Sequence, residues 1–283
     1  MPMQLRSGIT NSLLPLPIEK ENPTPIWLLI RGLCRQKLHW EDFPTKLSQQ
    51  LNGQVICCDI AGTGSQWQVT TPRSITAIMR QLRHTFRQQH QHVSYPIRLL
   101  GISMGGMIAT EWAKHFPNEV ERMVFINTSF KEFSPLHQRL KLHNVPTLLK
   151  ILTSPPLQQE QLILKMTSHT APHTHNQQSH TQINNHQALA QRWADYAVQQ
   201  PVSRQNALRQ LVAASRFSPP TQAPIKHILL LASSHDRLVD VSCSTVIAKK
   251  WLCPIHYHPT AGHDLPLDDS SWVCHQIAEW LTE

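Results

Sequence analysis

The sequence has no apolar run approaching the about 20 residues that a membrane-spanning helix needs. Its apolar runs are short, such as Ile26 to Ile30, and are typical of buried strands. Residues 1–25 contain scattered prolines and lack the apolar core and cleavage site of a secretory signal. Charged residues make up only 16% of the 283 residues and hydrophobic ones 40%, which excludes a disordered polar chain. We therefore expect a soluble globular protein with no membrane as a partner.

The cysteines lack both the paired spacing of a zinc site and the density of a disulfide framework. Most of the six lie in apolar segments, and the adjacent pair Cys57 and Cys58 ends one of them. We interpret them as buried free thiols rather than a redox switch. Free thiols favour a reducing compartment, so a cytoplasmic location is predicted.

Acidic residues are scarce in one part of the chain. The whole sequence carries a formal charge of +8, and residues 131–224 hold nine basic but only three acidic residues, a local charge of +6. Such a section would attract an acidic partner. The basic residues are not interleaved with aromatic ones in a recognisable module, so nucleic acid is not predicted as a partner.

Short apolar runs and amphipathic segments alternate in the first 130 residues. The predicted strands are 26–30, 54–59, 97–100 and 120–126, and the predicted helices between them are 40–51, 74–89 and 104–115. After an interruption the same alternation returns with strands 225–232 and 255–258 and helices 243–251 and 272–281. This pattern predicts an α/β protein whose mostly parallel sheet is covered by helices on both faces.

The interruption is predicted to be a helical insertion. It contains four helix-like segments and no convincing strand; the segments are 136–152, 158–166, 188–199 and 203–215. A polar stretch, residues 168–187, is expected to be a long solvated loop. The boundaries are therefore core 1–130, insertion 131–224 and core 225–283. The histidines of the polar stretch lack ordered ligand spacing, so no metal site is predicted at His173, His175, His180 and His186.

A Gly-x-Ser-x-Gly motif, residues 101–105, directly follows the strand 97–100 and opens the helix 104–115. This order of strand, turn and helix is that of a nucleophile elbow, in which Ser103 is exposed at a sharp turn. Glycine at 101 and 105 leaves room for two backbones to approach without a β-carbon. The sequence therefore predicts Ser103 as a nucleophile.

A serine nucleophile needs a base and an orienting acid, and two later loops offer them. Asp236 follows the strand 225–232, and His263 follows the strand 255–258. Because the carboxyl ends of parallel strands share one sheet edge, these residues can meet Ser103 there. Asp240 and Asp264 are the competing carboxylates; Asp264 is expected to brace its loop.

These motifs, in the order Ser, Asp, His, make the chain resemble the α/β-hydrolase superfamily over roughly residues 26–281. The resemblance implies an insertion that acts as a cap, with Ser103 as nucleophile, His263 as base and Asp236 as acid. It also implies an oxyanion hole made by the backbone amides of Leu33 and Met104. Many relatives have His-Gly where this chain has Arg31-Gly32, so Arg31 is either a bracing residue or a contact for an acidic substrate.

The resemblance implies an ester hydrolase without a cofactor, and the basic cap directs attention to an acidic carrier. The branch with a similar size and helical cap cleaves pimeloyl-[acyl-carrier-protein] methyl ester in biotin synthesis, which is the substrate expected here. The alternatives are a general carboxylesterase or thioesterase, a lyase of the menaquinone-pathway type, and a binding protein with a vestigial triad. The residues expected to contact the substrate or carrier are Arg31, Trp67, Arg139, Lys141, Arg204 and Arg209.

Overall fold

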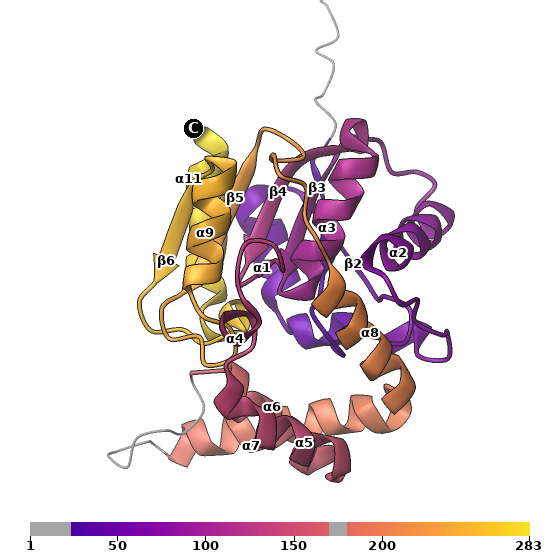
Figure 1. Ribbon diagram of the computed structural model, residues 1–283, viewed down its shortest axis with the longest axis vertical. Helices are drawn as coiled ribbons and strands as arrows, with labels where there is room; N and C mark the ends of the chain where they lie inside the picture. The colour runs from indigo at the N-terminus through magenta and orange to yellow at the C-terminus, as the bar shows by residue number, and fades with distance from the viewer. Residues whose placement is uncertain (1–23, 170–179) are drawn as a thin grey trace, which may run out of the picture.

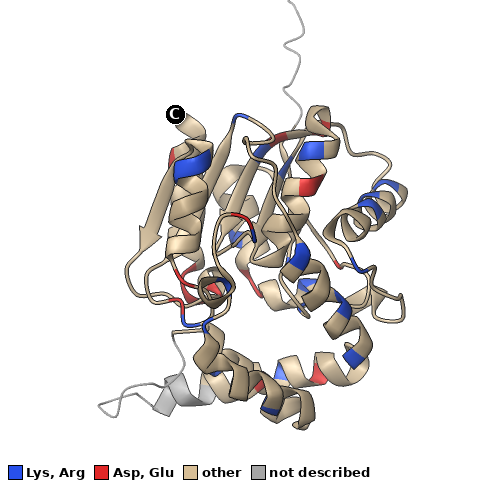
Figure 2. Ribbon diagram, in the orientation of Figure 1, with Lys and Arg blue, Asp and Glu red and all other residues tan. Residues whose placement is uncertain are grey.

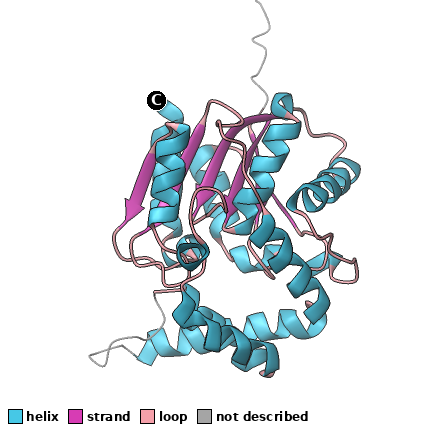
Figure 3. Ribbon diagram, viewed as in Figure 1, coloured by secondary structure: helices cyan, strands magenta, loops and turns pink. Residues whose placement is uncertain are grey.

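The computed structural model describes residues 24–169 and 180–283. Its centre is a six-stranded sheet in the order β2-β1-β3-β4-β5-β6, in which all paired strands are parallel (Figures 1 and 3). The strands are β1 (Ile26–Ile30), β2 (Gln54–Cys58), β3 (Ile97–Ile102), β4 (Val120–Ile126), β5 (Ile228–Ser233) and β6 (Ile255–His258). The predicted α/β-hydrolase fold with a parallel sheet is confirmed.

Helices cover both faces of the sheet and divide the apolar core into two layers. One layer packs α2 (Ile75–Gln89), α3 (Met104–His115) and α9 (Ser242–Trp251) on the sheet. The other packs α1 (Phe43–Leu51) and α11 (Ser270–Thr282) on the opposite face. The near-continuous apolar sequences of β1, β3 and β5 follow from this burial on both faces.

The order in which strands are added to the sheet changes direction between β1 and β3. It runs from β1 to β2 on one side and then returns to place β3 on the other side of β1. The loops that leave β1 and β3 therefore diverge, and such a switch point is where open parallel sheets bind ligands. Leu33 and Ser103 lie in these two loops.

The insertion is helical, as predicted, and lies beyond the carboxyl ends of the strands (Figure 1). Its helices are α4 (Leu136–Arg139), η4 (Leu142–Asn144), α5 (Val145–Thr153), α6 (Pro156–Thr167), α7 (His180–Gln199) and α8 (Arg204–Arg216). The prediction of a single helix over residues 136–152 was wrong, because three separate elements occupy this range. The chain is extended at Leu140 and Lys141, and Pro146 then lies in the first turn of α5. The loop expected over 168–187 was too long, since α7 already begins at His180.

The last cap helix, α8, packs on the core rather than on the other cap helices. Ala213 and Phe217 belong to the apolar layer of α2 and α3. Asn206 accepts the Thr71 N–H through Oδ1 (3.0 Å) and donates to the Val69 carbonyl (3.2 Å). These bonds fix α8 to the loop after β2.

The remaining short elements are η1 (Lys37–Trp40), η2 (Gly64–Gln66), η3 (Pro117–Glu119) and α10 (Leu265–Asp268). None of the helices within 24–169 and 180–283 has the length and apolar character to span a bilayer. All six cysteines are free and at least half-buried, as predicted.

Candidate active site

Ser103 stands at a sharp turn between β3 and α3. Its backbone is strained, with φ 55° and ψ −120°, in a region that few side chains other than glycine adopt. A β-carbon on Gly101 would lie 2.4 Å from the Gly105 backbone, and one on Gly105 would lie 2.1 Å from the Ile30 carbonyl oxygen. The predicted reason for both glycines is confirmed: strand and helix approach too closely for any larger residue.

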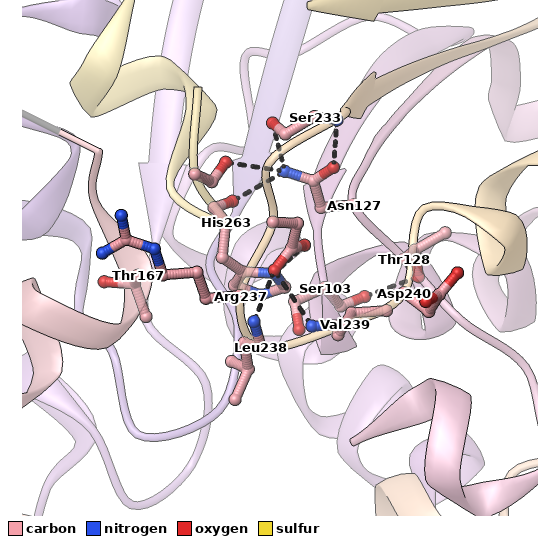
Figure 4. Close-up of polar contacts among 12 residues, drawn as sticks. Ser103, Asn127, Thr128, Thr167, Ser233, Arg237, Leu238, Val239, Asp240 and His263 are labelled. Carbon is pink, nitrogen blue, oxygen red and sulfur yellow. Dashed lines mark hydrogen bonds and ion pairs between the residues drawn. The ribbon is translucent and has the colours of Figure 1, made fainter. Parts of the chain in front are cut away.

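Asp236 and His263 form a buried pair at the same sheet edge, and Figure 4 shows His263 bonded to Asn127 there. His263 Nδ1 lies 2.6 Å from Asp236 Oδ2, and both residues are almost fully buried. The other carboxylate oxygen accepts the backbone N–H groups of Leu238 (2.8 Å) and Val239 (2.9 Å). This arrangement fixes the carboxylate and leaves Nε2 of His263 as the ring nitrogen that can accept a proton.

The electrostatics of His263 favour its charged form. Burial lowers the pKa of the imidazole, but the charge and hydrogen bond of Asp236 raise it, and Asp264 raises it further. The net pKa is above the ordinary value. A proton taken up by His263 is therefore stabilised in place by Asp236.

Asn127, which follows β4, links Ser233 at the end of β5 to the loop of His263 and was not anticipated from the sequence. Its Nδ2 donates to Ser233 Oγ (2.9 Å) and to the His263 carbonyl (2.8 Å), while its Oδ1 accepts the Ser233 N–H (2.8 Å). Its φ of 47° is one that asparagine tolerates better than most residues. The residue before it, Ile126, accepts the Ser103 N–H (2.9 Å). The Ser103 N–H and the His263 carbonyl thus bind consecutive residues at the end of β4.

The two expected oxyanion amides are placed beside the elbow. A β-carbon on Gly32 would meet Ser103 Cβ at 3.1 Å, so the loop carrying Leu33 touches the elbow. In the described part of the chain, no acceptor takes the N–H of Leu33 or of Met104. The loop is held from the cap: the next amide, Cys34 N–H, donates to Gln210 Oε1 on α8 at 2.8 Å. Gln210 is fully buried.

Arg31, for which a bracing role and a contact with an acidic substrate were both considered, pairs with a carboxylate of its own chain. Its two terminal nitrogens bind both carboxylate oxygens of Asp264, at 3.0 and 2.6 Å, and both side chains are only 5% exposed. The guanidinium also lies over the Trp40 ring, 4.6 Å from its centroid. Arg31 and Asp264 therefore brace the loops of Leu33 and His263 against each other, the bracing role expected of Asp264.

Three of the cap's expected contact residues are also engaged inside the protein. Arg139 donates to the carbonyls of Ala214 (2.7 Å) and Ser215 (3.3 Å) at the end of α8. Lys141 Nζ donates to the Asp236 carbonyl (2.7 Å). The remaining one, Arg209, donates to the Thr71 carbonyl (3.3 Å). These cations therefore stabilise the protein's own loops, and their expected role as contacts for a partner stays a prediction.

Arg204 alone of these cap residues is exposed, in the first turn of α8. Basic residues are spread over the whole molecule in Figure 2 rather than gathered on the cap.

Trp67 is half-buried beside α8, and its carbonyl lies 3.5 Å from Asn206 Nδ2. Two of the histidines weighed as metal ligands, His173 and His175, lie outside the described residues.

The cap also contacts the loop that carries His263. The Asp264 N–H donates to the Thr167 carbonyl at the end of α6 (2.7 Å). A β-carbon on Gly262 would lie 2.7 Å from the same oxygen, so only glycine fits there. Across the site, Arg35 in the Leu33 loop pairs with Glu160 of α6 (2.7 Å). The cap thus contacts the predicted base loop and the predicted oxyanion loop.

Comparisons with known proteins agree with this geometry. A family model described as serine aminopeptidase, S33, matches residues 22–270. No curated protein matches the sequence. The chain is similar to an esterase from Thermogutta terrifontis (17% identity, 91% of this chain and 89% of that one, TM-score 0.67). It is also similar to an enol-lactonase from Burkholderia xenovorans (16% identity, 94% of this chain and 94% of that one, TM-score 0.69). A third similar structure is a 2-hydroxy-6-oxo-6-phenylhexa-2,4-dienoate hydrolase from a Rhodococcus (15% identity, 92% of this chain and 91% of that one, TM-score 0.70).

Identities this low establish the fold alone, whereas the family model covers most of the sequence. The chain therefore belongs to the S33 serine aminopeptidase family of α/β-hydrolases.

Proposed function

We propose that this hydrolase cleaves carboxylic esters, with Ser103 as nucleophile, His263 as general base and Asp236 as the orienting acid. The observation that carries the proposal is the buried 2.6 Å contact between His263 and Asp236 at the sheet edge where the strained Ser103 stands. A base held by a carboxylate, at the sheet edge that carries a half-buried serine on a sharp turn, is the arrangement that activates a hydroxyl near neutral pH.

The reaction proceeds in two halves. Ser103 Oγ attacks the ester carbonyl while His263 Nε2 takes its proton, and the N–H groups of Leu33 and Met104 bind the oxyanion. Each such donor lowers the barrier by about 3 kcal/mol. His263 then protonates the leaving alcohol. A water molecule, deprotonated by His263, attacks the acyl group on Ser103 and releases the acid.

Labelling with a fluorophosphonate tests the nucleophile, and a p-nitrophenyl ester tests the reaction. The protein should be labelled at Ser103 and show a burst of p-nitrophenol, and Ser103→Ala should show neither. Labelling without a burst on any ester would favour a lyase, and no labelling would favour a binding protein. Aminoacyl p-nitroanilides belong in the same assay, because the family description names aminopeptidases.

The finer substrate proposal is the methyl ester of a carrier-linked pimeloyl chain. Its support is the +6 charge of residues 131–224. The contacts of Arg139, Lys141 and Arg209 reduce that support, and Arg204 remains as the exposed contact among the four residues proposed. If a carrier binds there, Arg204→Glu and added salt should each raise KM for the carrier-linked ester but not for a free short-chain ester. Equal effects on both esters would favour a general carboxylesterase or thioesterase.

A further inference from the structure

The cap helix α5 is unusually apolar for its position. Its sequence, VPTLLKILT, contains five large aliphatic residues among nine, yet none of its residues is buried. Leu149 is 61% exposed and Leu152 47% exposed. A helix on the surface of a globular protein normally turns its apolar stripe inward. In α5 much of the apolar surface meets solvent.

The exposed residues form one face. Val145, Leu149 and Leu152 are spaced four and three residues apart, which places them on the same side of the helix. Leu142 in η4 (60% exposed) and Leu157 in α6 (37%) are exposed apolar residues on the elements directly before and after α5. We call these five residues the α5 face. Within the described residues, α5 packs mainly on η4 and α6, its neighbours in sequence.

The charge around the α5 face is positive. Residues 133–159 contain no Asp or Glu, and Lys150 is exposed next to Leu149. An apolar helix face accompanied by lysine complements a bilayer surface with anionic headgroups, where the aliphatic side chains enter the acyl boundary and the ammonium meets phosphate. A strongly acidic protein is a poorer match, because leucines rather than cations dominate this face.

We propose that the α5 face binds the surface of an anionic phospholipid bilayer. The cap lies beyond the carboxyl ends of the strands (Figure 1), so this contact brings the triad's end of the molecule towards the lipid. If the protein is the ester hydrolase proposed above, its substrates would then be esters presented at a lipid surface. This departs from the expectation, made from the sequence, that no membrane is a partner: that expectation rested on spanning segments.

Flotation of the full-length protein with vesicles tests the proposal. The vesicles contain phosphatidylcholine with or without phosphatidylglycerol. The unaltered protein should float with the anionic vesicles, and Leu149→Asp/Leu152→Asp should lower the bound fraction by about tenfold or more. Leu252→Asp is the matched control: Leu252 is 91% exposed, but it follows α9 in the core, so its replacement should leave flotation unchanged.

Two further readouts separate the outcomes. Thermal unfolding and turnover of a soluble short-chain ester should be the same for the double variant as for the unaltered protein, which excludes misfolding. Ser103→Ala should lose ester hydrolysis and still float. An unaltered protein that floats but hydrolyses no ester would refute the proposed function and leave the bilayer contact standing. No flotation of the unaltered protein, or equal flotation of the double variant, overturns the proposal. So does a concentration-dependent dimer that the double variant abolishes without any lipid binding, which would identify a second copy as the occupant.

Discussion

Gln210 provides a test of whether the cap helix α8 positions the oxyanion hole. Its Oε1 accepts the Cys34 N–H at 2.8 Å, one residue after the amide of Leu33. Gln210→Met keeps the length and volume of the side chain but removes this acceptor. The Cys34 amide would then lack a partner at a half-buried position, and the loop would move to satisfy it.

The expected change in kcat follows from two free-energy costs, that of an unsatisfied Cys34 N–H and that of a displaced oxyanion donor. An unsatisfied N–H in such a position costs about 1–3 kcal/mol, so the loop gains by shifting. Complete loss of one oxyanion donor would cost about 3 kcal/mol, which is more than 100-fold in kcat. A partial displacement of Leu33 should lower kcat by roughly tenfold and leave KM little changed, because the donor acts mainly in the transition state.

The assay is steady-state hydrolysis of a short-chain p-nitrophenyl ester, with thermal unfolding measured alongside. Asn206→Ala is the matched control: Asn206 lies one helical turn earlier on α8 and binds the loop of Val69 and Thr71 instead. It should lower the melting temperature without lowering kcat. A Gln210→Met protein that folds and keeps kcat within about twofold of the unaltered enzyme would refute the positioning role.

Three other results are expected. The proposed mechanism requires neutral His263, and its pKa is raised above the ordinary 6.5, so kcat/KM should fall as the pH drops through a midpoint above that value. Asp264→Asn should lower the free energy of unfolding by about 3–5 kcal/mol in urea melts, because it leaves Arg31 buried without its carboxylate; a change below 1 kcal/mol would contradict the bracing role. Burial raises the pKa of Cys57 and of Cys58 to about 12, so neither should react with iodoacetamide in the native protein at pH 7.5, and both should react after unfolding.

The sheet was predictable because its central strands are buried on both faces. Runs such as Ile26–Ile30 and Val120–Ile126 have no alternation that would suit a half-exposed strand, and each ends at a loop. The site was predictable where chemistry constrains the local sequence. Glycine is required at 101 and 105 because a β-carbon at these positions would lie 2.4 and 2.1 Å from backbone atoms of neighbouring segments. The two glycines leave a recognisable motif in the sequence.

The partners of the basic residues were not predictable. A guanidinium such as that of Arg139 or Arg209 can bind a carrier or a carbonyl of its own chain, and composition alone does not distinguish the two. Here both bind carbonyls. Asn127 was missed for a related reason. Its role depends on bonds to Ser233 and His263, more than 100 residues away, and only its position after a strand could have indicated it.

The contact between Gly262 and the Thr167 carbonyl determines how this enzyme could be given a different cap by recombination. A chimera that exchanged α6 would replace the segment whose Thr167 carbonyl fits against Gly262, and a chimera that also exchanged α8 would lose Gln210. The natural exchange unit is therefore smaller than the whole insertion, with junctions before α5 and between α5 and α6, and with α6, including Thr167, and α8 retained. Libraries built on these junctions would vary what enters the site while keeping the backbone supports of the proposed triad.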